Sequence, residues 1–74
     1  MPRMIVRYAL TRDAAGEVVF RDDELQEIVG FSFAERETDL ERFVCDCEFR
    51  FITLSELRAA KDALQAAGFE VAPV

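Results

Sequence analysis

The sequence contains no histidine, so it lacks the commonest general base and the commonest metal ligand of proteins. Its three glycines form no phosphate-binding loop, and the motifs G-x-S-x-G, GxGxxG and GxxxxGKS/T are absent. These absences favour a protein that is not an enzyme and that binds no cofactor. A small enzyme that uses Cys45, Cys47 and nearby carboxylates is an alternative, because such groups can act without histidine.

Long apolar segments are also missing. No stretch approaches the roughly 20 apolar residues that a membrane-spanning helix needs. The N-terminal segment MPRMIVRYALTRD lacks the apolar core and the small-residue cleavage site of a signal peptide. We therefore expect a cytoplasmic protein without membrane contact.

Cysteine is scarce, and Cys45 and Cys47 are too few for a disulfide scaffold and too close in sequence for an ordinary bridge. As a metal site the pair needs two further ligands, which without histidine come only from carboxylates or a second chain. The spacing also differs from the C-x-x-C of redox pairs. We predict that both thiols are small buried groups on the inner face of a strand and hold no metal.

Apolar residues are abundant, with seven phenylalanines and an apolar fraction of 51%. A chain of 74 residues has room for one domain, residues 1–74, and must bury nearly every large apolar side chain to be stable alone. The composition argues against intrinsic disorder. We therefore expect a single folded domain.

Negative charge is concentrated in the middle of the chain, although the net charge is only −6. Residues 22–48 hold ten carboxylates against two arginines, whereas residues 1–21 carry a net charge of +2 and residues 49–74 are neutral. A concentrated negative surface repels nucleic acid and anionic membranes and attracts basic protein surfaces. Charge therefore indicates a basic protein partner and argues against direct binding of nucleic acid.

The first half of the chain begins with a predicted hairpin. Met4–Leu10 alternates as a strand, with every second residue from Met4 on its apolar face. Residues 11–17 contain the turn formers Asp13 and Gly16, and residues 18–20 return as a short strand.

A short helix is predicted next. Asp22 or Asp23 caps it, and Leu25 belongs to its apolar stripe. The helix runs to Val29 and ends at Gly30, which suits a left-handed conformation.

Strands are predicted for the segment between this helix and the next. The segment GFSFAERE, residues 30–37, is a strand region that begins with its two phenylalanines, Phe31 and Phe33, and a polar turn follows around residues 38–41. Residues 42–52 then alternate. Five apolar positions lie on one face of this strand: Phe43, Cys45, Cys47, Phe49 and Phe51. An alternative begins a helix at Thr38, which has capping-box spacing to the glutamate three residues later, but five alternating positions favour the strand.

The clearest element is a helix over residues 54–67. Thr53 and Glu56 have capping-box spacing at its start. Gly68 provides a left-handed stop, which lets Phe69 pack back on the helix. The apolar stripe consists of Leu57, Ala60, Leu64 and Ala67.

Residues 69–72 are predicted as a last strand, whose extension Pro73 blocks. The element order is then strand, strand, helix, strand, strand, helix, strand. The simplest packing is a two-layer α+β sandwich, with both helices on one face of a mainly antiparallel sheet of four to five strands. The opposite face carries Asp46 and Glu48 and is exposed to solvent.

Carboxylates of the acidic middle are the candidate partner-binding residues, because a strand spaces alternate carboxylates about 6.7 Å apart and can roughly imitate the phosphates of a nucleic acid. The first choice is the set without a local structural role: Glu35, Glu37, Asp39, Glu41, Asp46 and Glu48. The second choice is the set whose charge suits a helix N-terminus: Asp22, Asp23, Glu24 and Glu27.

The segment ITLSELRAAKDALQAAGFEV, residues 52–71, resembles the helix and strand in the C-terminal region of the YebC family of bacterial transcription and translation regulators. The segment DDELQEIV also resembles an acidic helix start in those proteins. The family is much longer, and its basic N-terminal helical region is absent here. The resemblance implies a helix packed on an antiparallel sheet.

In size, acidity and lack of enzymatic motifs the chain also resembles the phage-encoded anti-CRISPR proteins, which share no common sequence signature. This resemblance implies binding to a CRISPR surveillance complex or nuclease. We expect a non-enzymatic inhibitor, a monomer or weak homodimer, whose acidic surface docks on the basic site of this or another nucleic-acid-binding protein and acts as a DNA mimic. Two alternatives are a module that self-associates through a sheet edge or through Phe31 and Phe33, and a small metal-binding protein that uses Cys45 and Cys47.

Overall fold

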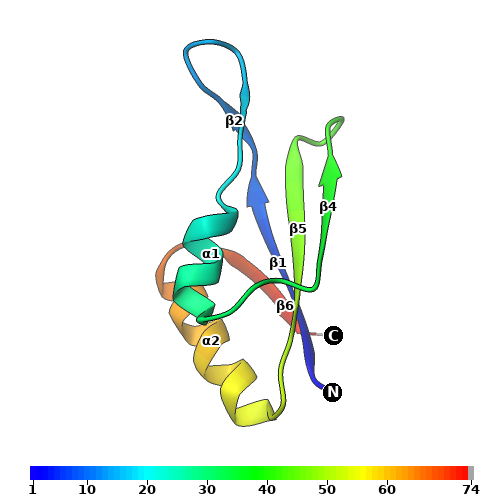
Figure 1. Ribbon diagram of the computed structural model, residues 1–74, viewed down its shortest axis with the longest axis vertical. Helices are drawn as coiled ribbons and strands as arrows, with labels where there is room; N and C mark the ends of the chain where they lie inside the picture. Colours follow the sequence, from blue (N-terminus) through cyan, green and yellow to red (C-terminus); the bar gives the residue numbers. More distant parts are fainter. Residues whose placement is uncertain (74) are drawn as a thin grey trace.

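The computed structural model describes residues 1–73, which form a four-stranded antiparallel sheet, a two-stranded hairpin and two helices (Figure 1). The elements in chain order are β1 (Arg3–Ala9), β2 (Thr11–Arg12), β3 (Val18–Val19), α1 (Asp22–Val29), β4 (Glu35–Asp39), β5 (Val44–Arg50), α2 (Leu54–Ala66) and β6 (Glu70–Pro73). The main sheet has the strand order β4-β5-β1-β6, and both helices pack on one of its faces. The predicted two-layer α+β architecture is confirmed. Neither helix in this part of the chain is long and apolar enough to cross a membrane.

Alternation along the strands builds the core, because a strand turns successive side chains to opposite faces. In β1 the side chains of Met4 and Val6 are fully buried, and in β5 the side chain of Phe49 is fully buried. Helix α1 contributes Leu25 and helix α2 contributes Leu64, both without exposed surface. The core therefore lies between the main sheet and the helix layer.

Helix α2 begins and ends much as the sequence predicts. The Thr53 hydroxyl accepts a hydrogen bond from the Glu56 amide at 3.2 Å, which satisfies a free N–H group of the first turn. At the other end Gly68 has a φ of 91°, and its amide and that of Phe69 donate to carbonyls of the last turn at 3.0 Å. This turn places Phe69 in the core, where it is 5% exposed.

Helix α1 ends at Val29 as predicted, but it begins earlier than predicted, at Asp22, and its predicted cap is wrong. Arg21 occupies the position before the helix, and its side chain makes no capping hydrogen bond. Asp22 is the first helical residue, and its carboxylate binds groups of the sheet instead of helix amides. Asp23 also lies within the helix, so neither aspartate is the cap. Gly30 ends the helix in the left-handed conformation, as predicted.

The N-terminal hairpin differs from the prediction in its pairing. Strand β3 pairs with β2, opposite Thr11 and Arg12, and not with β1. Strand β1 instead lies between β5 and β6 in the middle of the main sheet. The hairpin turn closes locally, because the Asp13 carboxylate accepts from the amides of Ala15 and Glu17. The hairpin therefore projects beyond the main sheet (Figure 1).

The strand that was predicted to begin at Phe31 begins later, at Glu35. Phe31 and Phe33 lie on the connection from the helix layer to the sheet. Their rings contact the Phe49 ring edge-on, with centroids 6.1 and 6.4 Å away. The two aromatic side chains thus pack at the edge of the core and help to hold the connection in place.

Three further predictions concern the ends of strands. Thr38 lies within β4, opposite Cys45, so the alternative helix at Thr38 is wrong. Phe43, predicted as the first inward residue of the following strand, lies in the turn with a φ of 59°, and β5 begins at Val44. Strand β6 runs to Pro73, and the predicted block beyond Pro73 concerns a position outside the described residues.

Candidate functional site

The face of the main sheet opposite the helices, here called the open face, carries rows of charged side chains. The strand register sets Glu35 of the edge strand β4 directly opposite Glu48 of β5. Two residues along, it sets Glu37 opposite Asp46. Like charges directly opposite each other on neighbouring strands repel, so this arrangement costs stability unless other charges offset it.

All six first-choice carboxylates border this face. They line two adjoining hollows that share Glu37 and Asp46. Together they are called the acidic patch: Glu35, Glu37, Asp39, Glu41, Asp46 and Glu48. The register of β4 on β5 brings five of them together, and Glu41 lies in the turn that joins the two strands.

Arginines on the same face offset the negative charges of Asp46 and Glu48. Arg7 donates two hydrogen bonds to Asp46, at 2.7 and 2.9 Å. Glu48 pairs with Arg3 at 3.3 Å and Arg50 at 3.1 Å and is only 9% exposed, so its predicted exposure to solvent is wrong. The hydrogen bonds from Arg7 hold the pKa of Asp46 below its ordinary value. The two inner carboxylates therefore already have partners within the chain.

The outer carboxylates of the patch are more available. Glu35, Glu37 and Glu41 are exposed, and within residues 1–73 they form no ion pair. Asp39 accepts hydrogen bonds from the amides of Glu41 and Arg42 at 3.0 Å, which shapes the turn after β4. The charge that a partner could reach is thus concentrated on β4 and this turn.

The second-choice carboxylates lie on α1, in the helix layer, so the structure does not bring them together with the acidic patch. Asp23 and Glu27 are exposed to solvent. Glu24 is bound by Arg21 through two hydrogen bonds of 2.9 and 3.0 Å. Only Asp22 points into the molecule, and it belongs to a different site.

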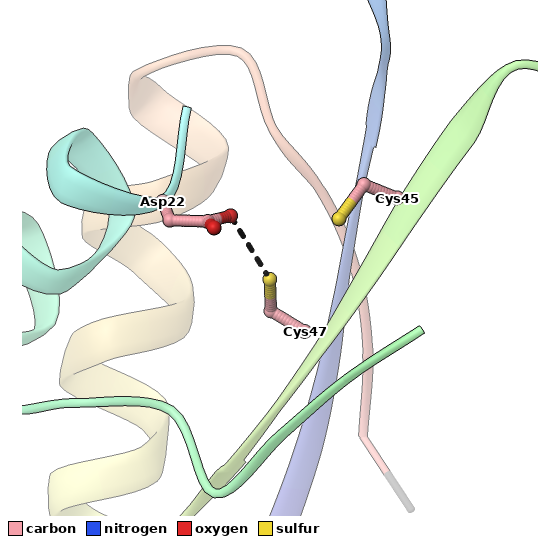
Figure 2. A group of neighbouring side chains, drawn as sticks. All are labelled: Asp22, Cys45 and Cys47. Atoms are coloured by element: carbon pink, nitrogen blue, oxygen red, sulfur yellow. Dashed lines mark hydrogen bonds between the residues drawn. The ribbon is translucent and has the colours of Figure 1, made fainter. Parts of the chain in front are cut away.

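Asp22 meets two thiols between α1 and the sheet. Figure 2 shows Asp22 reaching from the start of α1 toward Cys47, with the Cys45 side chain close by on the same strand. The Cys47 thiol donates to Asp22 Oδ1 across 3.7 Å, and one carboxylate oxygen and the two sulfurs all lie within 4.8 Å of one another. These three residues are called the thiol–carboxylate cluster.

Two further side chains hold the carboxylate of this cluster. The Tyr8 hydroxyl donates to Asp22 Oδ1 at 2.7 Å and accepts from the Arg21 amide at 3.0 Å. The Arg36 guanidinium binds the other carboxylate oxygen and stacks on the Phe20 ring, 4.3 Å from its centroid. Groups from β1, β4 and β5 therefore converge on one acid of α1.

The predicted burial of both thiols is confirmed, since Cys45 and Cys47 are free and have no exposed surface. Burial raises the pKa of the Cys47 thiol and that of the Tyr8 hydroxyl well above their ordinary values. Both groups are therefore protonated at neutral pH, and Cys47 is not activated as a nucleophile. The inward position of Asp22 was not predicted, although it lies three residues before Leu25 on the apolar stripe of α1.

An apolar groove lies beside the C-terminal end of α1. It is lined by Phe31, Ile52 and the small side chains of Ala59 and Ala63 on α2. Phe31 is 43% exposed and Ile52 is 78% exposed. Neighbouring exposed apolar side chains are typical of contacts with other proteins.

No family model, curated protein or solved structure matches this chain significantly. The comparisons therefore attach no known activity or partner to the acidic patch, the thiol–carboxylate cluster or the apolar groove. What each surface can bind follows from its own residues.

Proposed function

We propose that the chain is a non-enzymatic inhibitor or interaction protein whose acidic patch docks on the basic nucleic-acid-binding site of a partner protein. One observation carries this proposal: among the described residues, Glu35 and Glu37 on the edge strand are exposed and have no cationic partner. Each lies opposite a second carboxylate on the neighbouring strand β5, and the arginines of the open face pair only with that second carboxylate, so Glu35 and Glu37 can pair with cations of a partner. An anti-CRISPR-type inhibitor of a surveillance complex or nuclease is its most concrete version.

The mechanism is competition for cations. Alternate residues on a strand lie about 6.7 Å apart, close to twice the roughly 3.4 Å advance between successive phosphates of a DNA strand. Glu35 and Glu37 can therefore contact lysine and arginine side chains that otherwise hold phosphates. Arginine on the partner would contribute most, because its guanidinium meets a carboxylate through two parallel hydrogen bonds.

The arginines of the open face contribute rigidity and selectivity. Arg7 holds Asp46 in place through two hydrogen bonds, and Arg3 and Arg50 hold Glu48. A patch built on a sheet and held in this way loses little conformational freedom when it binds. The arginines also interrupt the negative surface with positive charge, so a partner must match both signs.

Charge reversal at Glu35, Glu37 and Glu41 is expected to abolish partner binding without unfolding the chain, because these side chains make no ion pair among the described residues. Tagged chain would be used to capture proteins from nuclease-treated lysate of the native host at about 0.1 M and about 1 M salt. Screening shortens the Debye length from about 10 Å to about 3 Å over this range, so capture should be lost at high salt. The captured protein would then be tested for competition between the chain and its nucleic acid.

The matched control reverses the charges of three exposed residues outside the acidic patch: Glu17, Glu27 and Asp62. Both triple variants change three charges by two units each and bring the net charge from −6 to zero. Only the location of the charge differs between them, so the control should bind like wild type. Equal binding by the two variants, or a partner that holds the chain and its nucleic acid together, would contradict the proposal.

Self-association is the second candidate, and the apolar groove favours it. If two copies pack their grooves together, light scattering will show a size that rises with concentration and does not depend on salt. Replacing Ile52 by lysine should then keep the chain monomeric, because it places a charge in the contact. Leu40→Lys is the control, since Leu40 is 65% exposed and lies in the turn after β4. A constant monomeric size of wild type would exclude this candidate.

A further inference from the structure

The thiol–carboxylate cluster lies in the layer between α1 and the sheet and has no part in the proposed docking. Its three ligand atoms come from the first turn of α1 and from alternate residues of β5. We propose that Asp22, Cys45 and Cys47 bind a thiophilic divalent cation, for which Zn²⁺ fits the donor set. The sequence alone places only the two thiols together, and folding brings the carboxylate to them.

The spacing of the donor atoms is close to that of a zinc site. Zinc binds sulfur at about 2.3 Å and carboxylate oxygen at about 2.0–2.2 Å, which sets tetrahedral ligand atoms roughly 3.5–3.8 Å apart. The distance between Cys47 Sγ and Asp22 Oδ1 is already 3.7 Å, and the largest separation within the cluster is at most 4.8 Å. A contraction of about 1 Å is within reach of rotation about the short cysteine side chains.

The groups around the cluster suit a metal site. The Arg36 guanidinium holds the outer oxygen of Asp22, so the inner oxygen is oriented toward the thiols. The Tyr8 hydroxyl donates a hydrogen bond of 2.7 Å to that inner oxygen and also holds it in place. Residues from two strands, β1 and β4, thus position the carboxylate.

Charge balance also favours a divalent cation with thiolate ligands. The single negative charge of Asp22 is already offset by Arg36. When two Zn–S bonds form, Cys45 and Cys47 each release one proton to solvent, and the two thiolates offset the two charges of Zn²⁺. The cluster therefore keeps its net charge in a site that is shielded from water. Mg²⁺ and Ca²⁺ prefer all-oxygen ligands and are not expected to bind.

Asp22 separates the thiols from two partly exposed side chains. The Arg36 side chain is 37% exposed, and the Phe20 residue on which it stacks is 43% exposed. Both lie on the outer side of Asp22. Rotation of these two side chains is the entry route that the proposal requires.

The experiment titrates Zn²⁺ into reduced, metal-free full-length chain by calorimetry, with Co²⁺ or Cd²⁺ absorption as a direct signal of thiolate ligation. One equivalent should bind and raise the midpoint of thermal unfolding. The Cys45→Ala/Cys47→Ala variant should lose more than about 100-fold in affinity for Zn²⁺, because even a group that only hydrogen-bonds to a metal ligand contributes about 10–100-fold. Asp22→Asn should weaken binding about 10-fold or more. Glu35→Gln/Glu37→Gln, which alters only the acidic patch, should bind like wild type.

The absorption signal of the wild-type chain keeps the test independent of whether the variants fold. No saturable binding to folded wild type, or binding without a sulfur-to-metal absorption band, would overturn the proposal. Unchanged affinity in a folded double cysteine variant would do the same. Loss of binding in the Glu35→Gln/Glu37→Gln variant would place the metal on the acidic patch and contradict it as well.

Discussion

Replacing Phe49 by alanine is expected to lower the free energy of unfolding by about 3–5 kcal/mol. Phe49 has no exposed surface and lies in β5, at the centre of the main sheet. Its ring also meets the rings of Phe31 and Phe33 edge-on. The variant therefore loses buried area, leaves a cavity and removes the support of the connection between α1 and β4.

A loss of this size is large for so short a chain, since domains of this length have a total stability of about 4–11 kcal/mol. Urea unfolding followed by circular dichroism measures it through the shift in midpoint. Ile52→Ala is the control, because Ile52 is 78% exposed and its loss should cost less than about 0.5 kcal/mol. Similar midpoints for the two variants would show that Phe49 is not central to the core.

Asp22→Ala is expected to lower the free energy of unfolding by about 2–3 kcal/mol. Its carboxylate accepts hydrogen bonds from Tyr8, Cys47 and Arg36, which come from three different strands. Removal of the Asp22 carboxylate leaves the buried Tyr8 hydroxyl without a hydrogen-bond acceptor. It also removes the ion pair by which Arg36 of β4 holds α1 to the sheet. Both effects loosen the packing of α1 on the main sheet.

Asp23→Ala is the matched control for Asp22→Ala. Both residues lie in the first turn of α1, but Asp23 is exposed, so its loss removes only the interaction with the helix dipole, about 0.3–1 kcal/mol. Unfolding of both variants would be followed with chelator and reductant present, so that metal binding does not contribute. Equal losses would mean that the contacts of Asp22 with the strands add nothing to stability.

Hydrophobic periodicity predicts most of this architecture. The alternation of β1 and β5 and the three-to-four-residue spacing of α2 are reliable because burial of one face dominates the stability of each element. The ends of α2 are also predictable. Thr53 and Gly68 act on the backbone within one turn, so their effect depends little on the rest of the fold.

Pairing between distant segments is not predictable in this way. The polarity pattern of residues 18–20 is too short to indicate whether this strand pairs with β1 or with β2. Phe31 and Phe33, two positions apart, fit a strand as well as a connection that covers the core edge. In the structure both rings contact Phe49, which lies 16 positions or more along the sequence, so local pattern cannot reveal this packing.

The candidate sites show the same limit. The side chains of Asp46 and Glu48 point to the open face because they alternate along β5 with the buried cysteines. Their arginine partners on β1 were not predicted, because the pairing of β1 with β5 joins residues about 40 positions apart. The contact of Asp22 with Cys47 spans 25 positions and depends on the packing of a helix on the sheet.

Strand β1 is synthesised before both of its neighbours in the main sheet, β5 and β6. Arg3–Ala9 pairs with Val44–Arg50 on one side, and part of it pairs with Glu70–Pro73 on the other. Contacts so distant in sequence form slowly, because long loops must close first. The main sheet cannot be completed until residues 70–73 have left the ribosome. Until then the unpaired backbone of β1 is open to pairing with other nascent or misfolded strands.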